Sequence, residues 1–275
     1  MQETARSVRR AGRRIAVVPT MGALHQGHCS LVRLARERAD CVITTIFVNP
    51  MQFAPGEDLN RYPRPFEHDV ESASGAGSEY VFAPSVDQMY PAGFETSVVV
   101  DRLTTVLEGA ARPTHFRGVT TIVTKLLLCT QPDIAVFGQK DGQQVVVIKR
   151  MIADLNIPVE VVLAPIVREA DGLAMSSRNV YLSSEHRNEA PVLFRALQLG
   201  EQRVRDGSRD ASSVTNAMRN IITRDSSGVV EYISIADAES LEEQAAVRTG
   251  KIVMISLAVR FGTTRLIDNV VVQVP

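Results

Sequence analysis

The sequence predicts a protein of the α/β class, in which a parallel sheet is followed by a smaller α+β domain. Two observations support this fold class. Through the first 165 residues, apolar β-rich runs alternate with segments of helical periodicity, as in βαβ units. After about residue 167, two helical stretches come first and three strand-like stretches follow. The expected domains therefore span residues 1–167 and 168–275.

The strands of the first domain are predicted from short, nearly continuous apolar runs, which are typical of strands covered on both faces. They are Ile15–Val18, Val42–Val48, Tyr80–Phe82, Ser97–Val100, Ile134–Phe137 and Val159–Leu163. Two helices between them have apolar stripes over residues 119–127 and 148–155 and end before Pro132 and Pro158. Ligands of parallel sheets bind at the carboxyl ends of the strands, so the loops there are the first candidates for a site.

The second domain is predicted to contain two helices and three strands. The helices are Ser184–Arg205 and Ala211–Arg224, and the strands are Val229–Ile235, Ile252–Val259 and Leu266–Val274. The polar segment Arg168–Asn179 between the domains lacks periodicity and is a plausible hinge, a common place for a ligand site.

Composition excludes several classes of protein. The 275 residues carry 30 Lys and Arg against 31 Asp and Glu, which removes the strongest argument for a nucleic-acid or membrane-surface partner. No apolar run approaches the ~18 residues of a membrane-spanning helix. Three scattered cysteines fit a reducing compartment, so a cytoplasmic protein is expected. The Arg-rich N-terminus resembles a transit peptide, but a short surface helix is favoured there.

The first candidate for chemistry follows the strand at Ile15–Val18. Gly22 and Gly27 permit a tight turn, and His25 and His28 share one face of a helical first turn. Two imidazole donors beside the positive end of a helix suit a polyphosphate. Zinc binding and a purely structural histidine pair remain alternatives, although zinc would need further ligands. Neither a Walker A loop nor a G-x-G-x-x-G fingerprint is present.

Other candidates lie in four further loops. Amides after the second strand suit hydroxyls and carboxylates, and a lysine after the strand at Ile134–Phe137 can reach a phosphate. Two hydroxyls and a guanidinium in the hinge segment match pyrophosphate oxygens, and basic side chains precede a buried helix. These residues are Asn49 and Gln52; Lys140 and Asp141, with Gln143 and Gln144 one turn on; Ser176, Ser177 and Arg178; and Arg112, His115 and Arg117.

Together the segments PTMGALHQGH, FVNPMQF, RYPR, LEGAARPTHFRGV, KDGQQ and READGLAMSSRN-x-YLS closely resemble the pantothenate synthetase (pantoate–β-alanine ligase) family. The resemblance implies a Rossmann-like nucleotide-binding domain, a small C-terminal domain that closes over it, a homodimer and a place in the coenzyme A pathway. It also implies that ATP, (R)-pantoate and Mg²⁺ give pantoyl adenylate and pyrophosphate. The amine of β-alanine then releases pantothenate and AMP.

The resemblance also assigns roles to residues. His25 and His28 are implied to donate to the phosphates, with Lys140, Ser176, Ser177 and Arg178 facing them, and His28 as the proton donor. Pantoate is implied to contact Gln52, Gln144, Asn49 and Arg112, and Gln52 also borders β-alanine; Asp69 is the candidate metal ligand. The full ATP set is Pro19, Thr20, Met21, Gly22, Ala23, Leu24, His25, Gln26, Gly27, His28, Gly138, Gln139, Lys140, Asp141, Val167, Met175, Ser176, Ser177 and Arg178.

Three positions depart from the family pattern. Gln139 replaces a carboxylate, Gly142 replaces an aromatic residue, and His68 stands where acidic residues are common. These departures bear on the level of activity more than on its type. A nucleotidyltransferase that stops after nucleotide transfer, and a nucleotide-binding regulator without turnover, are the competing hypotheses. A class I aminoacyl-tRNA synthetase is disfavoured because the chain has no room for an anticodon-reading domain.

Overall fold

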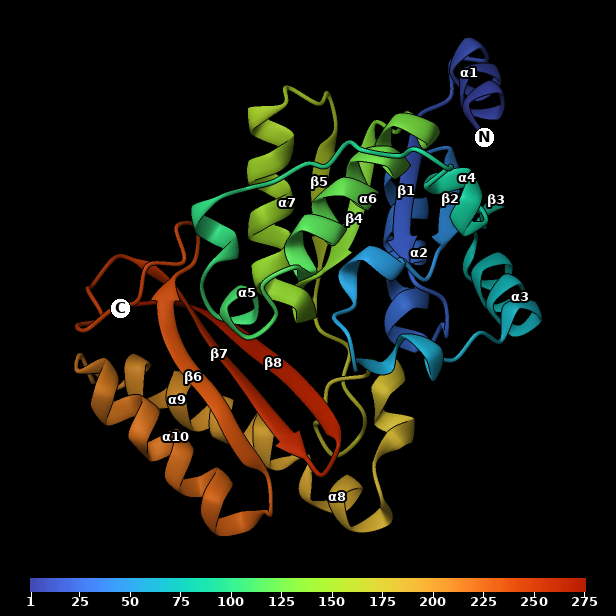
Figure 1. Cartoon of the computed structure of the whole chain (residues 1–275). Coiled ribbons are helices and arrows are strands. Elements are labelled where there is room, and N and C mark those ends of the chain that lie inside the picture. The colour runs from blue at the N-terminus through green and yellow to red at the C-terminus, as the bar shows by residue number, and fades with distance from the viewer. The chain divides into compact units, whose positions relative to one another are not determined.

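The computed structural model describes residues 1–275, and the chain divides into two compact units (Figure 1). The first unit comprises residues 1–139 and 147–165, and the second comprises residues 140–146 and 166–275. The expected division at residues 167 and 168 lies close to the last boundary. The sequence did not predict that Lys140–Val146 would group with the second unit.

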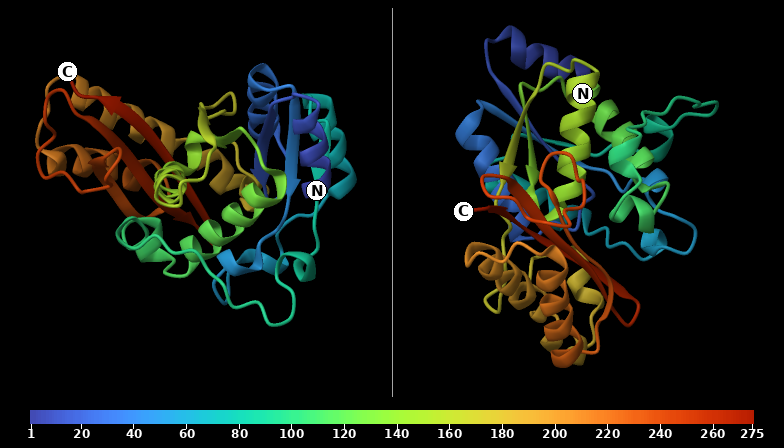
Figure 2. Two further views of the ribbon diagram at one scale, coloured as in Figure 1. Left: turned by 90° about the horizontal axis from the view of Figure 1, so that it is seen from above. Right: turned by 90° about the vertical axis from the view of Figure 1, so that its left-hand side faces the viewer.

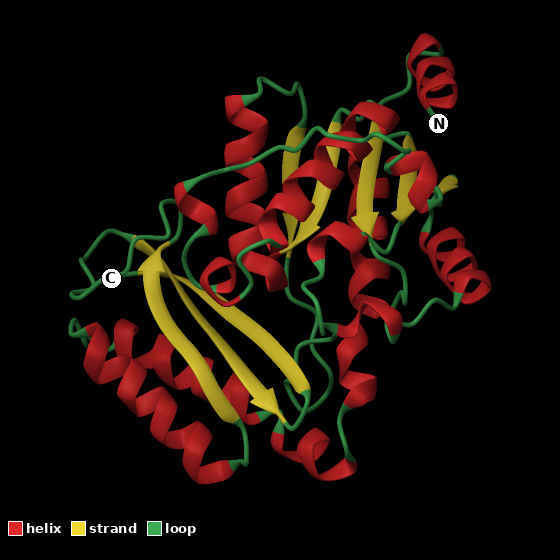
Figure 3. Cartoon of the chain, in the orientation of Figure 1, coloured by secondary structure: helices red, strands yellow, loops and turns green.

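The first unit is built on a parallel sheet with the strand order β3-β2-β1-β4-β5. The predicted parallel α/β architecture is therefore confirmed. The strands are β1 (Ile15–Thr20), β2 (Cys41–Ile46), β3 (Tyr80–Phe82), β4 (Ile134–Gly138) and β5 (Glu160–Ala164), drawn in yellow in Figure 3.

The predicted strand Ser97–Val100 is wrong. This stretch pairs with no strand and instead bonds to side chains of a helix: the Val98 N–H donates to Thr121 Oγ1 at 3.0 Å, and Thr120 Oγ1 donates to the Val98 carbonyl at 2.6 Å. Two threonine hydroxyls thus replace the neighbouring strand that an apolar β-branched run normally requires.

Both faces of the parallel sheet are covered, as the continuous apolar strands predict. On one face, Ala16 and Val18 of β1 pack with Leu31, Val32 and Ala35 of α2. On the other, Ile15 packs with Ala5 and Val8 of α1. The helices are α1 (Gln2–Arg10), α2 (Gln26–Arg38), α3 (Phe66–Ala76), α4 (Val86–Met89), α5 (Glu108–Ala111), α6 (His115–Thr130) and α7 (Gly142–Asp154), with short 3-10 turns η1 (Pro50–Gln52), η2 (Asp58–Asn60), η3 (Arg102–Thr104) and η4 (Gln139–Asp141).

The second unit is an antiparallel sheet, β6-β7-β8, packed against two helices. In Figures 1 and 2, α9 and α10 lie side by side along one face of this sheet. Their core includes Leu193, Leu197, Met218 and Ile222 against Leu257. The single predicted helix Ser184–Arg205 is two helices, because Pro191 interrupts it. The elements are η5 (Ser177–Tyr181), α8 (Ser184–Glu189), α9 (Val192–Arg205), α10 (Ala211–Asp225), β6 (Val229–Asp237), β7 (Ile252–Phe261) and β8 (Thr264–Gln273).

The strand order fixes where a ligand of the first unit would lie. From β1 the chain adds β2 and β3 on one side of the sheet and then adds β4 and β5 on the other side. The direction in which strands are added therefore reverses between β1 and β4. Open α/β sheets bind ligands outside the carboxyl ends of the strands at such a switch point. The turn after Thr20 and the residues Gly138 and Gln139 leave the sheet there. No helix in the chain combines the length and apolar character needed to cross a membrane.

Candidate active site

The turn after β1 is held in shape by a buried carboxylate from α3. Gly22 and Ala23 adopt left-handed backbone conformations with φ of 82° and 50°. Asp69 accepts hydrogen bonds from the N–H groups of Ala23 at 2.9 Å and Leu24 at 2.7 Å. A Cβ atom on Gly22 would lie 2.8 Å from Asp69 Oδ2, so only glycine fits beside this carboxylate. Both carboxylate oxygens of Asp69, the candidate metal ligand, thus accept hydrogen bonds from the backbone of the turn.

His25 and His28 cap the start of α2 reciprocally. His25 is the N-cap residue and its Nδ1 accepts from the Gly27 N–H at 3.1 Å, while His28 Nδ1 accepts from the His25 N–H at 3.3 Å. The ring centroids are 4.1 Å apart, which confirms that the two imidazoles lie together. A neutral imidazole whose Nδ1 accepts carries its proton on Nε2. Each ring therefore carries an Nε2–H donor at the positive end of a helix.

Asn49 holds together the loop after β2, which also carries Gln52, a residue expected to contact pantoate. Its Nδ2 donates to Gln52 Oε1 at 3.1 Å and to the Gly118 carbonyl at 3.0 Å. Its Oδ1 accepts from the Tyr90 hydroxyl at 2.7 Å and from the Met51 N–H at 3.3 Å. An amide has two donors and two acceptor lone pairs, so all of its capacity is used within the protein. Asn49 supports its neighbours, a role the sequence did not predict.

Gln52 lies beside the turn that carries the histidines. Its Nε2 is 2.9 Å from Met21 Sδ, and the side chain is only 8% exposed. The helix α6 approaches this loop closely, since a Cβ on Gly118 would lie 2.4 Å from the Met51 carbonyl oxygen. The structure therefore brings Met21 and Gln52, which are expected to contact ATP and pantoate respectively, next to one another.

Arg112 is engaged by an acid that the sequence analysis missed. Its guanidinium donates to both carboxylate oxygens of Glu57, at 2.7 and 2.6 Å, and to the Gln52 carbonyl at 3.1 Å. Burial acts to raise the pKa of Glu57, but hydrogen bonding and charge from Arg112 outweigh it, and the pKa falls below its ordinary value. No spacing in the sequence signals this pair, because Glu57 lies in a loop without periodicity.

His115 supports the same loop from the first turn of α6. Its Nδ1 lies 3.0 Å from the Gln52 carbonyl oxygen and donates to it. Burial, reinforced by the positive charge of Arg112, lowers the pKa of His115 to about 4. The imidazole is therefore neutral at pH 7 and acts as a hydrogen-bond donor, while Arg117 lies exposed on the same helix.

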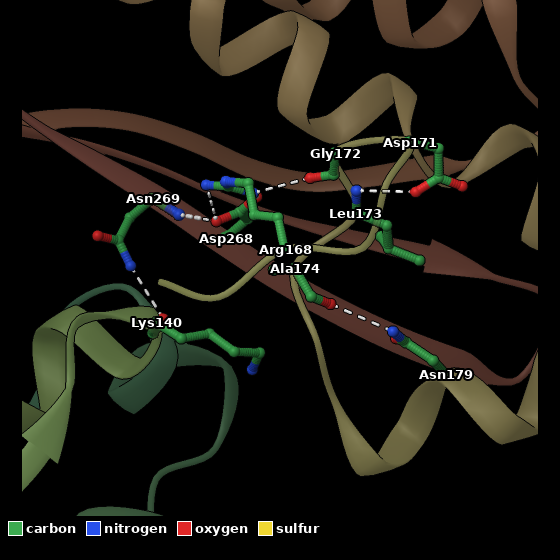
Figure 4. A network of polar contacts seen from close by, with 9 residues as sticks. All are labelled: Lys140, Arg168, Asp171, Gly172, Leu173, Ala174, Asn179, Asp268 and Asn269. Carbon is green, nitrogen blue, oxygen red and sulfur yellow. Dashed lines mark hydrogen bonds and ion pairs between the residues drawn. The ribbon is translucent and has the colours of Figure 1, made fainter. Parts of the chain in front are cut away.

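In the second unit, Lys140 lies in the 3-10 turn η4 before α7. Its Nζ is 3.7 Å from Asp141 Oδ1, and its carbonyl accepts from Asn269 Nδ2 at 2.9 Å (Figure 4). Gln144 lies in the first turn of α7 and is partly buried. The hydrogen bond to Asn269 therefore holds the main chain of Lys140, while its side chain stays partly exposed.

The segment Arg168–Asn179 is ordered by polar contacts. Arg168 forms an isolated antiparallel bridge with Ala174, and Asn179 Nδ2 donates to the Ala174 carbonyl at 3.2 Å. The Met175 N–H donates to the Val167 carbonyl at 3.0 Å. The Ser176 hydroxyl accepts from the Arg178 N–H at 3.2 Å, and Ser177 and Arg178 begin η5. The expected phosphate-binding residues here are all partly buried.

Arg168 joins this segment to β8. It donates to Asp268 at 2.6 and 3.1 Å and to the Gly172 carbonyl at 3.1 Å, and its guanidinium lies 4.0 Å from the centroid of the Phe194 ring. Figure 4 shows the guanidinium between the carboxylate and the carbonyl. Burial raises the pKa of Asp268, and Arg168 opposes that rise. The sequence signal for this contact is the polar pair Asp268-Asn269, which interrupts the apolar run Leu266–Val272.

A parallel sheet of this order, with a glycine-containing turn and paired imidazoles at the carboxyl end of its first strand, defines a nucleotide-binding α/β protein. The chain belongs to the pantoate–β-alanine ligase family, whose profile matches residues 1–271. It ligates pantoate to β-alanine with the use of ATP, as the sequence resemblance predicted.

Individual relatives are similar to this chain over nearly its whole length. The pantothenate synthetase of Moorella thermoacetica is 54% identical, covering 98% of this chain and 94% of that protein. The crystal structure of pantothenate synthetase from Thermus thermophilus has a TM-score of 0.90 at 45% identity and covers 97% of this chain and 96% of that one. The ligase of Francisella tularensis, solved in complex with β-γ ATP and β-alanine, has a TM-score of 0.78 at 32% identity, covering 98% and 94%.

Proposed function

We propose that this chain performs the ligation in two half-reactions. In the first, a carboxylate oxygen of (R)-pantoate attacks the α-phosphorus of ATP, and the bond from that phosphorus to the bridging oxygen breaks to release pyrophosphate. In the second, the amine of β-alanine attacks the acyl carbon of pantoyl adenylate, forms the amide, loses a proton and displaces AMP. The products are pantothenate, AMP and pyrophosphate.

The observation that carries this proposal is the reciprocal capping of α2 by His25 and His28. Attack of a carboxylate on a triphosphate brings two anions together, which is unfavourable until donors neutralise the phosphates. The capping bonds orient both rings so that their Nε2–H groups are the donors, at a helix N-terminus that itself favours anions. Donors that are fixed before the reaction stabilise the transition state without reorganisation. Of the two imidazoles, we propose His28 as the proton donor.

The remaining site residues are proposed from the family resemblance and their placement. Lys140, Ser176, Ser177 and Arg178 are proposed to bind phosphates of the same ATP, and Gln52 and Gln144 to bind pantoate. Gln52 is also proposed to border β-alanine. Asn49 and Arg112, whose polar groups are engaged by protein partners, are proposed to hold Gln52 in place. A crystal soaked with a nucleotide tests the set, and side chains that point away from the phosphates would contradict it.

Magnesium is proposed to enter as the complex with ATP. The chain has no group of three or more His, Cys, Asp or Glu side chains placed to hold a metal, and Asp69 already accepts two backbone hydrogen bonds. The charge of the ion would screen the phosphates during attack. We also propose a cytoplasmic homodimer in which residues 168–275 close over the first domain and exclude water from the adenylate.

Pantoate-dependent exchange of labelled pyrophosphate into ATP tests the first half-reaction. We expect His28→Ala to slow exchange by about 10²–10³-fold, with a loss of stability near the ~1 kcal/mol of a helix cap. His186→Ala, which removes an imidazole elsewhere, is the matched control and should exchange normally. Absence of exchange in the unmodified protein would refute the adenylate, and a large stability loss without a rate effect would favour the structural reading of the histidines.

A further inference from the structure

Two adjacent residues of β8 bond to the two segments of the second unit that carry its proposed phosphate-binding side chains. Asp268 and Asn269 are both 3% exposed and interrupt the apolar run Leu266–Val272 of this strand. Asp268 binds Arg168 at the start of the Arg168–Asn179 segment, and Asn269 donates to the carbonyl of Lys140. Figure 4 shows both connections leaving the same strand.

The register of the sheet explains how neighbours reach different partners. Successive side chains of a strand point to opposite faces. Asp268 is paired with Leu257, which packs in the core with α9 and α10. Asn269 is paired with Ser256, so its side chain lies on the opposite face with that of Met254. On that face the Asn269 amide meets the main chain at Lys140.

Gly142 leaves the room that this contact needs. A Cβ atom at residue 142 would lie 2.6 Å from Met254 Sδ and 3.2 Å from Asn269 Nδ2. Met254 and Asn269 thus occupy the volume next to the first turn of α7. Because the nearest asparagine atom is the one that donates to Lys140, any side chain at residue 142 presses on this hydrogen bond.

We infer that Asn269 is a positioning residue that fixes the main chain at Lys140 and thereby the direction of its ammonium group. A neutral amide does this without adding another carboxylate to the one that Asp141 places 3.7 Å from the Lys140 ammonium group. The inference rests on the proposed role of Lys140 in binding phosphate. Misplacement of a reacting group by about 1 Å costs up to ~10²-fold in rate, so the contact has a measurable consequence.

The test is a double-mutant cycle on the full chain, measured by pyrophosphate exchange. Asn269→Asp keeps the size of the side chain but cannot donate to the carbonyl. We expect it to lower the exchange rate by about 10–100-fold when Lys140 is present and by less than about threefold in a Lys140→Met background. Ser256→Ala, which changes the register partner on the same buried face, is the control and should exchange at the unmodified rate.

Gly142→Ala provides an independent variant should Asn269→Asp fail to fold. It should lower exchange through the same contact, and this loss should also shrink in the Lys140→Met background. Equal losses in both backgrounds, or normal exchange by folded Asn269→Asp or Gly142→Ala protein, would overturn the inference. Normal exchange by Lys140→Met alone would refute the role of Lys140 itself, which is a different result.

Discussion

Replacing Asp69 with asparagine removes the carboxylate that holds the turn between β1 and α2. Asp69 is 1% exposed and accepts two backbone N–H bonds. Asparagine keeps one oxygen that accepts one of these hydrogen bonds. Its NH2 group replaces the other oxygen and faces the second backbone N–H, which then has no acceptor. Hydrogen bonds to charged groups contribute about 1.5–3 kcal/mol, and a buried unpaired donor costs about 1–3 kcal/mol. We therefore expect Asp69→Asn to lower the free energy of unfolding by about 2–4 kcal/mol.

Urea unfolding at pH 7 measures this loss, with Glu71→Gln as control because Glu71 lies exposed on the same helix. Pyrophosphate exchange should also fall, since the turn carries His25 and His28. A loss below about 0.5 kcal/mol would refute the anchoring role, being within the range of ordinary surface substitutions. Recovery of full activity on raising Mg²⁺, with stability unchanged, would instead support Asp69 as a metal ligand.

Three further predictions concern stability. His115 has a pKa of about 4 when folded, below its ordinary 6.5, so the unfolded state binds its proton first. The stability that the neutral His115 contributes is present above pH 6.5 and is lost as pH falls toward 4, by at most about 3 kcal/mol. Unfolding measured at pH 7 and at pH 5 should show this loss for the unmodified protein and not for His115→Asn. Gly118→Ala should destabilise by about 1–3 kcal/mol or more because the methyl group meets backbone, whereas Gly75→Ala, in open space, should be neutral or stabilising in the same thermal melts. Arg168→Gln should cost about 3–5 kcal/mol in urea unfolding by leaving Asp268 buried without its partner, and an unchanged midpoint would contradict this.

The sequence was a good guide where local pattern and tertiary packing agree. Strands at Ile15 and Ile134 and the apolar stripe of α6 were predicted because their periodicity reflects burial on the sheet. The stretch Ser97–Val100 was misread because its β-branched residues satisfy their backbone on threonine hydroxyls, which periodicity does not reveal. Tertiary partners overrode local propensity there.

The closeness of the two histidines was predictable from the sequence, but the contacts that support the candidate site were not. The pairing of His25 with His28 follows from spacing, and the structure confirms it. Asp69, Glu57 and Asn269 act on residues distant in sequence. The polar pair Asp268-Asn269 in an apolar run marks β8 as unusual, but no pattern in the sequence names the partner of any of these three residues. Such contacts form only when distant segments meet in the folded protein, and they leave no periodic pattern in the sequence.

The saturated bonding of Asn49 has a consequence for the proposed role of Gln52 in binding pantoate. Because Asn49 donates to Gln52 Oε1, the Gln52 amide cannot flip, and its nitrogen is the end turned toward Met21. A ligand at that nitrogen must bring an oxygen that accepts. Analogues with a methyl or amino group at the corresponding position would leave the amide unmatched, and a rigid site of this kind rejects them more strongly than an adaptable one.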